Sequence, residues 1–310
     1  MKNVYFLPAW DNTSAEMLET LKHQTPDGEG SWKSIQGTAQ LFDADAFILQ
    51  DYTTDEMESF LKINNLWDRT YYFSREVPGA GPIKQYDAAG TFSYLDGSSY
   101  LYTKWVYPNE TNGGVSTSYN TLLKATPPAK KKLMICIQSS KRILHGHQVR
   151  LDFIEKFCTT APVHIDLYGG ITKDSTFAKF NNKHQMKENN KFLTSEDYKY
   201  CLAFDNGQYN NYFGTQFTDA LLSWCIPVYW GAPNIDDFFP SDSFITFDAT
   251  DENEIDRIIE LINDPDDYAK RLPALTEARN LVLNKYNIWD TINEVVTTGK
   301  STWGHNDSER

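Results

Sequence analysis

Short apolar runs and segments of helical spacing alternate along the first half of this 310-residue chain. The apolar runs predict strands at residues 4–7, 46–50 and 70–74, with shorter extended segments at residues 92–95 and 100–106. Apolar residues at helical spacing predict intervening helices at residues 14–23 and 54–63. Strands that alternate with helices indicate a parallel sheet with crossover connections.

The second half repeats this alternation with stronger apolar runs. Residues 133–137 are continuously apolar, as expected for a strand that is buried on both faces. Further strands are predicted at residues 163–167, 200–204, 226–230 and 244–247. Helices are predicted at residues 147–157, 215–224, 252–262 and 266–283. A last helix near residues 288–297 is expected to cross back onto the first half, before a frayed tail at residues 299–310.

The two halves are separated by a segment with two prolines and three lysines, Thr126-Pro127-Pro128-Ala129-Lys130-Lys131-Lys132. This composition predicts an inter-domain linker whose lysines form a solvated face. We therefore expect an α/β protein with domains at residues 1–128 and 129–286, and a terminal helix and tail at residues 287–310 that packs back on the first domain. Two Rossmann-like domains of this kind face a central cleft, where ligands normally bind.

The charge balance limits the class of partner. The net charge is −13, from 29 basic and 42 acidic residues. A surface of that sign repels nucleic acid and anionic lipid, so we expect neither as the main partner. A small anionic ligand stays compatible, because a few local cations can hold a phosphate. The high aromatic content, 14%, fits either an aromatic-rich core or a cleft that stacks on sugars or a nucleobase.

The cysteines and the lengths of the apolar runs indicate in which cellular compartment the protein resides. Four widely spaced cysteines predict neither a disulfide framework nor a zinc site. The apolar run at the N-terminus is too short for a signal peptide, and no stretch approaches the ~18 consecutive apolar residues of a membrane span. The expectation is a soluble, cytoplasmic protein.

Residues 198–248 carry the strongest indication of a ligand site. A buried strand is expected to end at Asp205 and Asn206, and a loop rich in amides then leads to a helix with Thr215 and Gln216 in its first turn. Backbone N–H groups at a helix start, together with the helix dipole, favour an anion. On its own, the pattern fits a nucleotide-type ligand or the ordinary amide caps of a loop.

The order of motifs in this segment resembles the donor-binding region of the alpha-1,3-fucosyltransferases, glycosyltransferase family 10. A strand is followed by F-[DE]-N-x-Q, aromatic-x-T, a helix with A-L-L, I-P-V-Y-W-G-x-P-N and F-P-x-x-S-F-I. The resemblance implies a GT-B architecture and inverting transfer of L-fucose from GDP-fucose to a glycan hydroxyl. It also implies donor-binding roles for Asn206, Tyr212, Phe213, Thr215 and Gln216.

The same resemblance implies roles for two residues outside this segment. Arg150 lies on the helix after the first strand of the second half, where the family places a phosphate-binding arginine. A structural ion pair is its alternative role. Glu76, in F-S-R-E-V-P, resembles the family's Glu-x-Pro region and would deprotonate the acceptor hydroxyl as general base. Asp87 and Asp96 lie nearby as rivals, and an exposed loop glutamate is the plain alternative.

The chain departs from the family at the end of the donor loop. The family has Tyr-x-Thr-Glu-Lys, with the glutamate on the ribose and the lysine on phosphate, where this chain has Tyr212-Phe213-Gly214-Thr215-Gln216-Phe217. Gln216 can still hydrogen-bond a ribose hydroxyl, but Phe217 cannot hold a phosphate. Either Arg150, helped by Lys141 or Arg142, carries the diphosphate, or the donor differs, or the protein binds its donor weakly.

We predict no catalytic metal. Two Asp-x-Asp triplets occur, Asp43-Ala44-Asp45 and Asp264-Pro265-Asp266. The first is expected in an exposed loop and the second at the capped start of a helix. Without a metal, Arg150 and helix N-terminal amides must stabilise the charge of the leaving group.

The sequence thus predicts a fucosyltransferase-like enzyme that takes a nucleotide sugar and a glycan acceptor as partners and needs no cofactor. The same fold with a xylose, galactose or rhamnose donor is the alternative, because of Gln216 and Phe217. A non-catalytic glycan-binding relative is the alternative from another class. The acceptor, the linkage and the oligomeric state stay open at this level.

Overall fold

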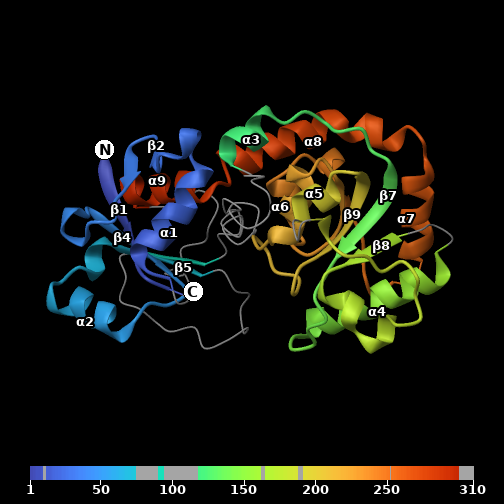
Figure 1. The fold of residues 1–310 in the computed structure, drawn as a ribbon, viewed down its shortest axis with the longest axis horizontal. Coiled ribbons are helices and arrows are strands. Elements are labelled where there is room, and N and C mark those ends of the chain that lie inside the picture. Colours follow the sequence, from blue (N-terminus) through green and yellow to red (C-terminus); the bar gives the residue numbers. More distant parts are fainter. Residues whose placement is uncertain are drawn as a thin grey trace. The chain divides into compact units, whose positions relative to one another are not determined.

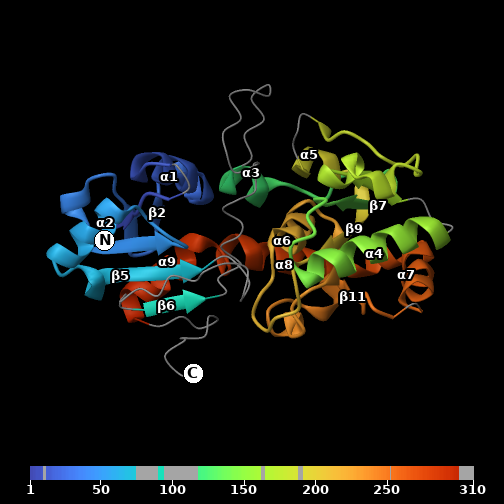
Figure 2. The same ribbon diagram turned by 90° about the horizontal axis from the view of Figure 1, so that it is seen from below.

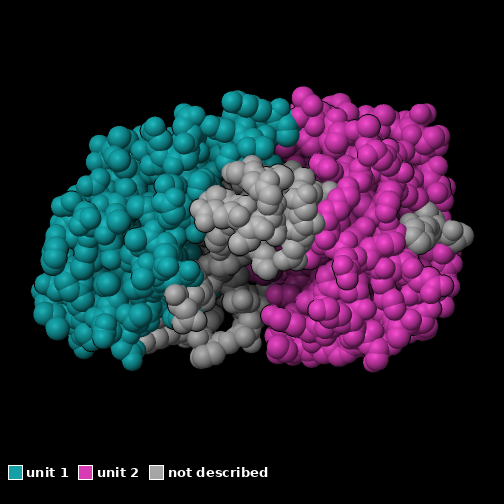
Figure 3. Space-filling model, viewed as in Figure 1, with its two compact units in different colours: residues 1–125, 283–310 teal, residues 126–282 magenta. Residues whose placement is uncertain are grey.

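The chain folds into two compact units, each built around one sheet. The computed structural model describes residues 1–9, 12–74, 90–93, 118–161, 165–187, 191–251 and 253–299. Unit 1 comprises residues 1–125 and 283–310, and unit 2 comprises residues 126–282 (Figure 3). Both sheets are almost wholly parallel and carry helices between their strands (Figure 1). The predicted α/β class is therefore confirmed.

Unit 1 contains a six-stranded sheet in the order β2-β3-β1-β4-β5-β6. Its strands are β1 (Lys2–Phe6), β2 (Ser31–Trp32), β3 (Ile35–Gly37), β4 (Ala46–Gln50), β5 (Thr70–Ser74) and β6 (Gly90–Ser93). All neighbours are parallel except the short β2–β3 pair, which the sequence pattern did not predict. The extended segment predicted at residues 100–106 lies outside the described residues.

The helices of unit 1 cover both faces of this sheet. They are α1 (Ser14–Leu21), α2 (Asp55–Ile63), α3 (Tyr119–Lys124) and α9 (Ile288–Thr298). On one face, Leu61 of α2 joins Tyr5, Phe47 and Leu49 in a buried cluster. Short 3-10 helices connect the elements of both units: η1 (Lys22–Gln24), η2 (Pro26–Gly28), η3 (Leu41–Asp43), η4 (Trp67–Arg69), η7 (Gly170–Lys173), η8 (Ser175–Phe177), η10 (Ile235–Asp237) and η11 (Ser241–Ser243).

The last helix, α9, packs inside unit 1 although it follows unit 2 in the chain. Its Trp289 is fully buried, stands edge-on to Phe6 of β1 at 5.5 Å between ring centroids, and donates from Nε1 to the Leu21 carbonyl at 2.8 Å. Asn287 caps the helix and also donates to the Gln24 carbonyl at 2.9 Å. A residue near the end of the chain thus completes a core that begins at β1.

Unit 2 contains a five-stranded parallel sheet in the order β11-β10-β9-β7-β8. Its strands are β7 (Lys132–Ile137), β8 (Ile165–Tyr168), β9 (Tyr198–Phe204), β10 (Ile226–Trp230) and β11 (Ile245–Thr246). The chain therefore runs outward from β7 in one direction to β8 and in the other from β9 to β11. The topological switch point, where open α/β sheets bind ligands, lies between the carboxyl ends of β7 and β9.

The helices of unit 2 are α4 (His145–Thr160), α5 (Lys191–Ser195), α6 (Thr215–Leu222), α7 (Glu254–Asn263) and α8 (Asp267–Asn284). Phe153 of α4 packs on Phe204 with ring centroids 5.9 Å apart. Ala220 of α6 instead joins the buried cluster of Ile135 and Cys201. Since Phe204 and Cys201 point to opposite faces of β9, α4 and α6 cover opposite faces of the sheet, and both can be followed in Figure 2.

Lys131 and Lys132 are exposed, as the composition of the lysine run predicts, but Lys130 is not part of this solvated face. Lys130 donates from Nζ to the carbonyls of Glu196 at 2.9 Å and Ser223 at 3.0 Å. Lys132 is the first residue of β7 and pairs with Asp166 at 2.7 Å. These side chains anchor the first strand of the sheet, because buried carbonyls and a carboxylate lie within their reach. No helix in the described ranges is both long and apolar enough to cross a bilayer.

Candidate active site

The candidate site lies at the carboxyl ends of β7 and β9 in unit 2, with α4 and α6 close by (Figure 1). After β7, residues 138–144 lead into α4. After β9, residues 205–214 lead into α6. These connections carry most of the residues that the sequence predicted for donor binding.

Arg150 is a buried cation in the second turn of α4, only 3% exposed. Its Nη2 donates to the Ser139 carbonyl at 3.4 Å, to Ser139 Oγ at 3.2 Å and to the Lys141 carbonyl at 3.4 Å. Its Nε has no partner, and no carboxylate of the described residues pairs with it. Burial lowers the pKa of the guanidinium, with Cys136 opposing. Because a buried charge without an opposite charge is costly, this arrangement is suited to an incoming anion.

The start of α4 contacts the loop after β9 directly. Gly146 lies so close to this loop that a Cβ there would be 2.5 Å from the carbonyl carbon of Asn206. In the next position, His147 Nε2 lies 3.0 Å from Asn206 Oδ1. His147 Nδ1 accepts from the backbone N–H groups of Ile143 at 3.2 Å and Leu144 at 3.0 Å. Glycine is thus required at position 146, and the two connections of the switch point are joined by side-chain hydrogen bonds.

Asp205 joins the loop after β9 to the end of β10. It is 3% exposed, and its Oδ1 accepts from the Gly214 N–H at 2.9 Å. Its Oδ2 accepts from the Tyr229 hydroxyl, which itself accepts from the Ala232 N–H at 2.9 Å. A Cβ at Gly231 would overlap both the Tyr229 hydroxyl and Asp205. The buried carboxyl therefore fixes the residue at which α6 begins.

Asp205 should make the stability of the protein fall as the pH rises. Burial raises the pKa of this carboxyl to about 7, although the hydrogen bonds from Tyr229 and Gly214 oppose the shift. The unfolded value is about 4, so the folded state binds more protons between about pH 4 and 7 and loses this stability on the way up. We expect Asp205→Asn to remove that decline, seen as urea-unfolding free energies of variant and wild type that converge or cross from about pH 5 to 8. Parallel pH profiles would contradict this.

The start of α6 presents Thr215 and Gln216 at a partly exposed helix N-terminus. No side chain of the described residues caps this end, and the preceding residue is Gly214. Backbone N–H groups in the first turn are therefore available to an anion or to a ribose hydroxyl. The structure brings these two predicted residues to the same edge of the sheet as Asn206.

The aromatic residues beside this helix form a core. Phe213 is fully buried and lies 5.2 Å, between ring centroids, from both Phe238 and Phe239. Phe217 is fully buried too and lies 5.1 Å from Phe239. Tyr212 is 5% exposed. These rings support the loop from beneath, and the phenylalanine at position 217 fills the core instead of reaching for a ligand.

Among the described residues of unit 2, five buried side-chain donor groups have no hydrogen-bond partner: Gln138 Nε2, Arg150 Nε, Thr218 Oγ1, Trp224 Nε1 and Trp230 Nε1. Gln138 directly follows β7, and Trp230 ends β10. Buried polar groups are nearly always satisfied in native proteins. Gln138 and Trp230 lie at the carboxyl ends of their strands, so together with Arg150 they can donate to a ligand rich in acceptor oxygens.

The two cations proposed to assist Arg150 differ in their surroundings. Arg142 is engaged elsewhere, in an ion pair with Asp174 at 3.1 Å and a hydrogen bond to Thr176 Oγ1 at 3.1 Å. Lys141 has an exposed side chain and offers its carbonyl to Arg150. Of the two, Lys141 is the better placed to reach an anion without breaking an existing ion pair.

Residues 127–273, nearly the whole of unit 2, match the model of glycosyltransferase family 10 (fucosyltransferase) C-term. The predicted resemblance to glycosyltransferase family 10 is confirmed. An alpha-(1,3)-fucosyltransferase of Helicobacter pylori, FucT, is 37% identical to this family 10-like chain over 62 residues. That stretch is 20% of this chain and only 13% of the FucT sequence.

Solved structures of other proteins share the fold of this chain. An alpha1,3-fucosyltransferase gives a TM-score of 0.54 at 15% identity, over 91% of this chain and 90% of that one. The structure of an alpha1,3-fucosyltransferase with GDP gives 0.50 at 14% identity over the same shares. Anabaena HepE in complex with UDP-glucose gives 0.57 at 10% identity, over 96% of this chain and 100% of that one. The predicted GT-B architecture is confirmed, and the family match supports the predicted glycosyltransferase class.

Three predicted carboxylates of the family 10-like chain lie outside the described residues, the candidate base Glu76 and its rivals Asp87 and Asp96. Their roles stay predictions. In the parts of the chain that the structure describes, no group of three or more His, Cys, Asp or Glu side chains could hold a metal ion.

Sequence reasoning missed several residues that shape the site. Tyr229 stood in a quoted motif without a role, His147 was only the first residue of a predicted helix, and Gln138 was not singled out. Asn211 and Asn234 form a reciprocal pair, in which the Asn211 N–H donates to Asn234 Oδ1 at 2.9 Å and Asn234 Nδ2 donates to Asn211 Oδ1 at 2.9 Å. A signal for Asn211 was present in the sequence. Its backbone has a positive φ of 65°, and asparagine is one of the residues that adopt this left-handed conformation more readily than most.

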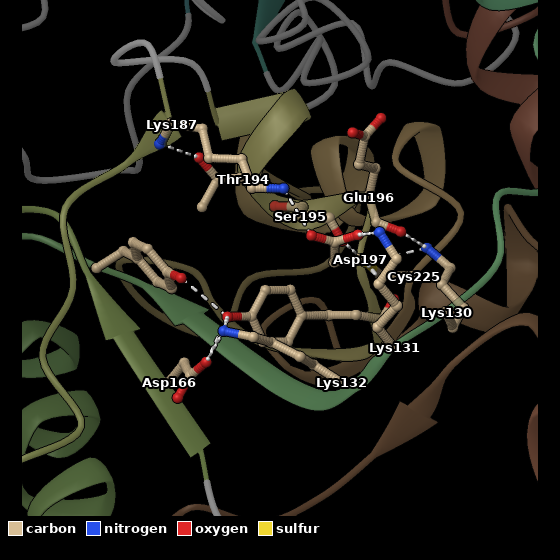
Figure 4. A network of polar contacts seen from close by, with 12 residues as sticks. Lys130, Lys131, Lys132, Asp166, Lys187, Thr194, Ser195, Glu196, Asp197 and Cys225 are labelled. Carbon is tan, nitrogen blue, oxygen red and sulfur yellow. Dashed lines mark hydrogen bonds and ion pairs between the residues drawn. The ribbon is translucent and has the colours of Figure 1, made fainter.

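A second polar cluster lies at the opposite edge of the same sheet, at the amino ends of β7 and β9 (Figure 4). A cavity of about 320 Å³ is lined there by Lys132, Asp166, His184 and Tyr198, among others. Asp166 accepts from Lys132 Nζ at 2.7 Å and from the Tyr198 hydroxyl at 2.5 Å, and lies 3.1 Å from His184 Nε2. The positive and negative charges of this cluster compensate one another, so the cluster mainly stabilises the first residues of these strands.

Asp166→Asn should cost stability at neutral pH but not in acid. Burial alone would raise the pKa of this carboxyl, but hydrogen bonds from Lys132 and Tyr198 outweigh it and lower the pKa to about 2. The stabilisation is therefore full above the unfolded pKa of about 4 and is lost as the pH falls towards 2. We expect a loss of about 1–3 kcal/mol at pH 7 in urea unfolding, shrinking at lower pH. Lys131→Met, which removes an exposed pair with Asp197, is the control and should stay within about 0.5 kcal/mol.

Proposed function

We propose that this chain is an inverting, metal-independent glycosyltransferase that moves a sugar, L-fucose as first choice, from a GDP-linked donor to a glycan hydroxyl. One observation carries the proposal. Arg150 is a buried guanidinium with an unpaired Nε and no carboxylate partner among the described residues, at the switch point of the unit that matches family 10. A nucleoside diphosphate would supply the missing anion.

The remaining donor contacts follow from the position of each group. The amides at the start of α6 would face phosphate oxygens, and Gln216 a ribose hydroxyl. Asn206 would contact the donor with its amide, and Lys141 would add a second cation for the phosphates. Guanine is the first choice of base because the fold neighbour with GDP is an alpha1,3-fucosyltransferase. Without a metal, these groups would stabilise the charge that develops on the leaving diphosphate.

The acceptor side of the proposal rests on Glu76, in unit 1. A carboxylate base on the face opposite the leaving group would deprotonate the acceptor hydroxyl, and a single displacement would invert the anomeric centre. Residues 1–128 would bind the glycan and residues 129–286 the donor. Because the four cysteines, all in described residues, form no disulfide, we place the reaction in a reducing compartment such as the cytoplasm.

A different donor is the second candidate. Gln216 and Phe217 replace the two charged residues of the family loop, and the fold neighbour HepE is in complex with UDP-glucose. A UDP- or TDP-linked xylose, galactose or rhamnose would use the same Arg150 and the same α6 amides. A glycan-binding relative without transfer is the third possibility, and it predicts glycan affinity without nucleotide.

Calorimetric titration of the purified chain with GDP, GDP-fucose, UDP, UDP-glucose and TDP, each with and without EDTA, tests the donor. We expect binding of GDP and GDP-fucose that EDTA leaves unchanged. Binding of UDP or TDP compounds only would keep the mechanism and discard GDP-fucose. Affinity for none of the nucleotides would overturn the transferase.

Glu76→Gln tests the base. Transfer, measured as GDP release in the presence of a glycan panel, should fall at least about 100-fold, because general base catalysis contributes about that much. The GDP-fucose dissociation constant should stay the same, since the base touches the acceptor. Asp87→Asn and Asp96→Asn are matched controls that should retain transfer. Loss of transfer in one of these, with Glu76→Gln active, would move the base to that aspartate.

A further inference from the structure

The hydrogen bonds around His147 fix its tautomer. Nδ1 accepts from two backbone N–H groups, those of Ile143 at 3.2 Å and Leu144 at 3.0 Å, so it carries no proton. A neutral imidazole then holds its proton on Nε2. Burial and the nearby cations Arg150 and Lys141 lower the pKa of His147, although the hydrogen bond with Asn206 opposes them, which agrees with the neutral ring that the two N–H contacts to Nδ1 indicate. The backbone thus decides which ring nitrogen donates.

This tautomer decides the orientation of Asn206. His147 Nε2 lies 3.0 Å from Asn206 Oδ1, and with its proton it donates to that oxygen. The amide oxygen is therefore used inside the protein, and the NH2 group of Asn206 is left facing away. No described residue accepts from this NH2 group, whereas Asn206 itself is partly exposed. Asn206 consequently turns the two N–H donors of its carboxamide towards its surroundings, while its amide oxygen is held by His147.

The contact is held from both sides. Gly146 permits the backbone of α4 to approach the Asn206 carbonyl, where any Cβ would collide. The preceding residue, Asp205, is tied to Gly214 and Tyr229. Neither the Asn206 amide nor the His147 ring can rotate without losing a partly buried hydrogen bond, which is costly to leave unmade.

We propose that His147 is a positioning residue for the nucleotide-sugar donor, holding the Asn206 carboxamide with its NH2 group towards an acceptor oxygen of the diphosphate or the sugar. This inference rests on the proposed function. With its NH2 group held in this direction, Asn206 is set to donate to oxygen lone pairs of the ligand. This role also explains why position 147 of α4 is a histidine. Its Nδ1 accepts from backbone N–H groups at the start of the helix, and its Nε2 orients Asn206.

Three substitutions of His147 separate the capping of α4 from the orientation of Asn206. His147→Asn retains an amide oxygen near the position of Nδ1 and can keep the cap, but it is too short to reach Asn206. His147→Gln places an amide NH2 near the position of Nε2 and can restore the donation to Asn206. His147→Ala loses both.

We expect His147→Asn to raise the GDP-fucose dissociation constant about 10-fold, measured by calorimetry, with an unfolding temperature close to that of wild type. His147→Gln should recover most of that loss. Asn206→Ala should weaken binding to a similar extent, and the double variant His147→Asn/Asn206→Ala should be no weaker than Asn206→Ala alone, because the two residues act through one contact. Additive losses, or wild-type affinity in His147→Asn, would overturn the inference.

The tautomer is tested without any ligand. Long-range 1H–15N NMR of the imidazole should show His147 with its proton on Nε2 and with Nδ1 unprotonated from pH 6 to 8. The other tautomer, or an imidazolium at pH 7, would overturn the inference even if the donor binds as proposed. A wild type that binds no nucleotide at all but shows the expected tautomer would instead defeat the proposed function and the positioning role that depends on it, while leaving the His147–Asn206 contact standing.

Discussion

Arg150→Met should weaken GDP binding by about 10-fold to more than 100-fold while leaving the protein as stable as wild type, or more stable. A charge-assisted hydrogen bond is worth about 1.5–3 kcal/mol, which sets the expected loss of affinity. Stability should not fall, because the guanidinium is buried without a carboxylate partner among the described residues and methionine fills a similar volume without a desolvation cost. Calorimetry with GDP and urea unfolding measure the two effects.

The matched control for this substitution is Arg142→Met. Arg142 is more exposed and already paired with Asp174, so its removal should change GDP affinity less than about threefold and stability by about 0.5 kcal/mol or less. If Arg150→Met destabilised the chain and kept its affinity for GDP, Arg150 would be a structural residue. An equal loss of affinity in both variants would indicate general attraction by positive charge.

Gly146→Ala should destabilise the protein and weaken donor binding together. The new Cβ would lie 2.5 Å from the carbonyl carbon of Asn206 and 2.9 Å from the backbone nitrogen of Gly207, and backbone atoms cannot swing aside as a long side chain can. We expect a loss of at least about 1–3 kcal/mol in urea unfolding, since overpacking in a tight contact costs this much. Donor affinity should fall together with stability, because Asn206 must move.

Gln148→Ala serves as the control on the same turn of α4. Its side chain is exposed and donates a hydrogen bond to Asp152 Oδ1 at 2.6 Å, so the change should be worth about 0.5 kcal/mol or less. Alanine should otherwise favour a helix over glycine by about 1 kcal/mol. A Gly146→Ala protein more stable than wild type would therefore mean that α4 and the loop after β9 do not touch in solution.

The sequence predicted the long strands well, because strands buried on both faces leave continuous apolar runs. Residues 133–137 and 226–230 correspond to β7 and β10 almost residue for residue. The β2–β3 pair escaped prediction because its strands are only two and three residues long. Its turn also uses Lys33 at a φ of 49°, where a glycine or asparagine would have given a signal.

The sequence predicted those parts of the candidate site whose residues lie close together in the chain. Asp205, Asn206 and Gln216 were expected at one edge of the sheet because a strand, a loop and a helix start succeed one another there. The pairing of His147 with Asn206 was not, since it joins residues 59 apart in sequence through the packing of α4. Phe213 was expected to touch the donor, yet an aromatic side chain in a loop does not reveal which way it faces.

The return of α9 to unit 1 has a consequence for the order in which the molecule matures on the ribosome. Unit 2 is encoded as one uninterrupted stretch, whereas the first sheet waits for Trp289 to cover Phe6. Domains generally fold as they emerge during synthesis, but here the earlier-made sheet would be finished last. The part of its apolar face that Trp289 covers would stay open while about 160 further residues are translated. The nascent chain would thus pass through a stage in which unit 2 is complete and unit 1 is not.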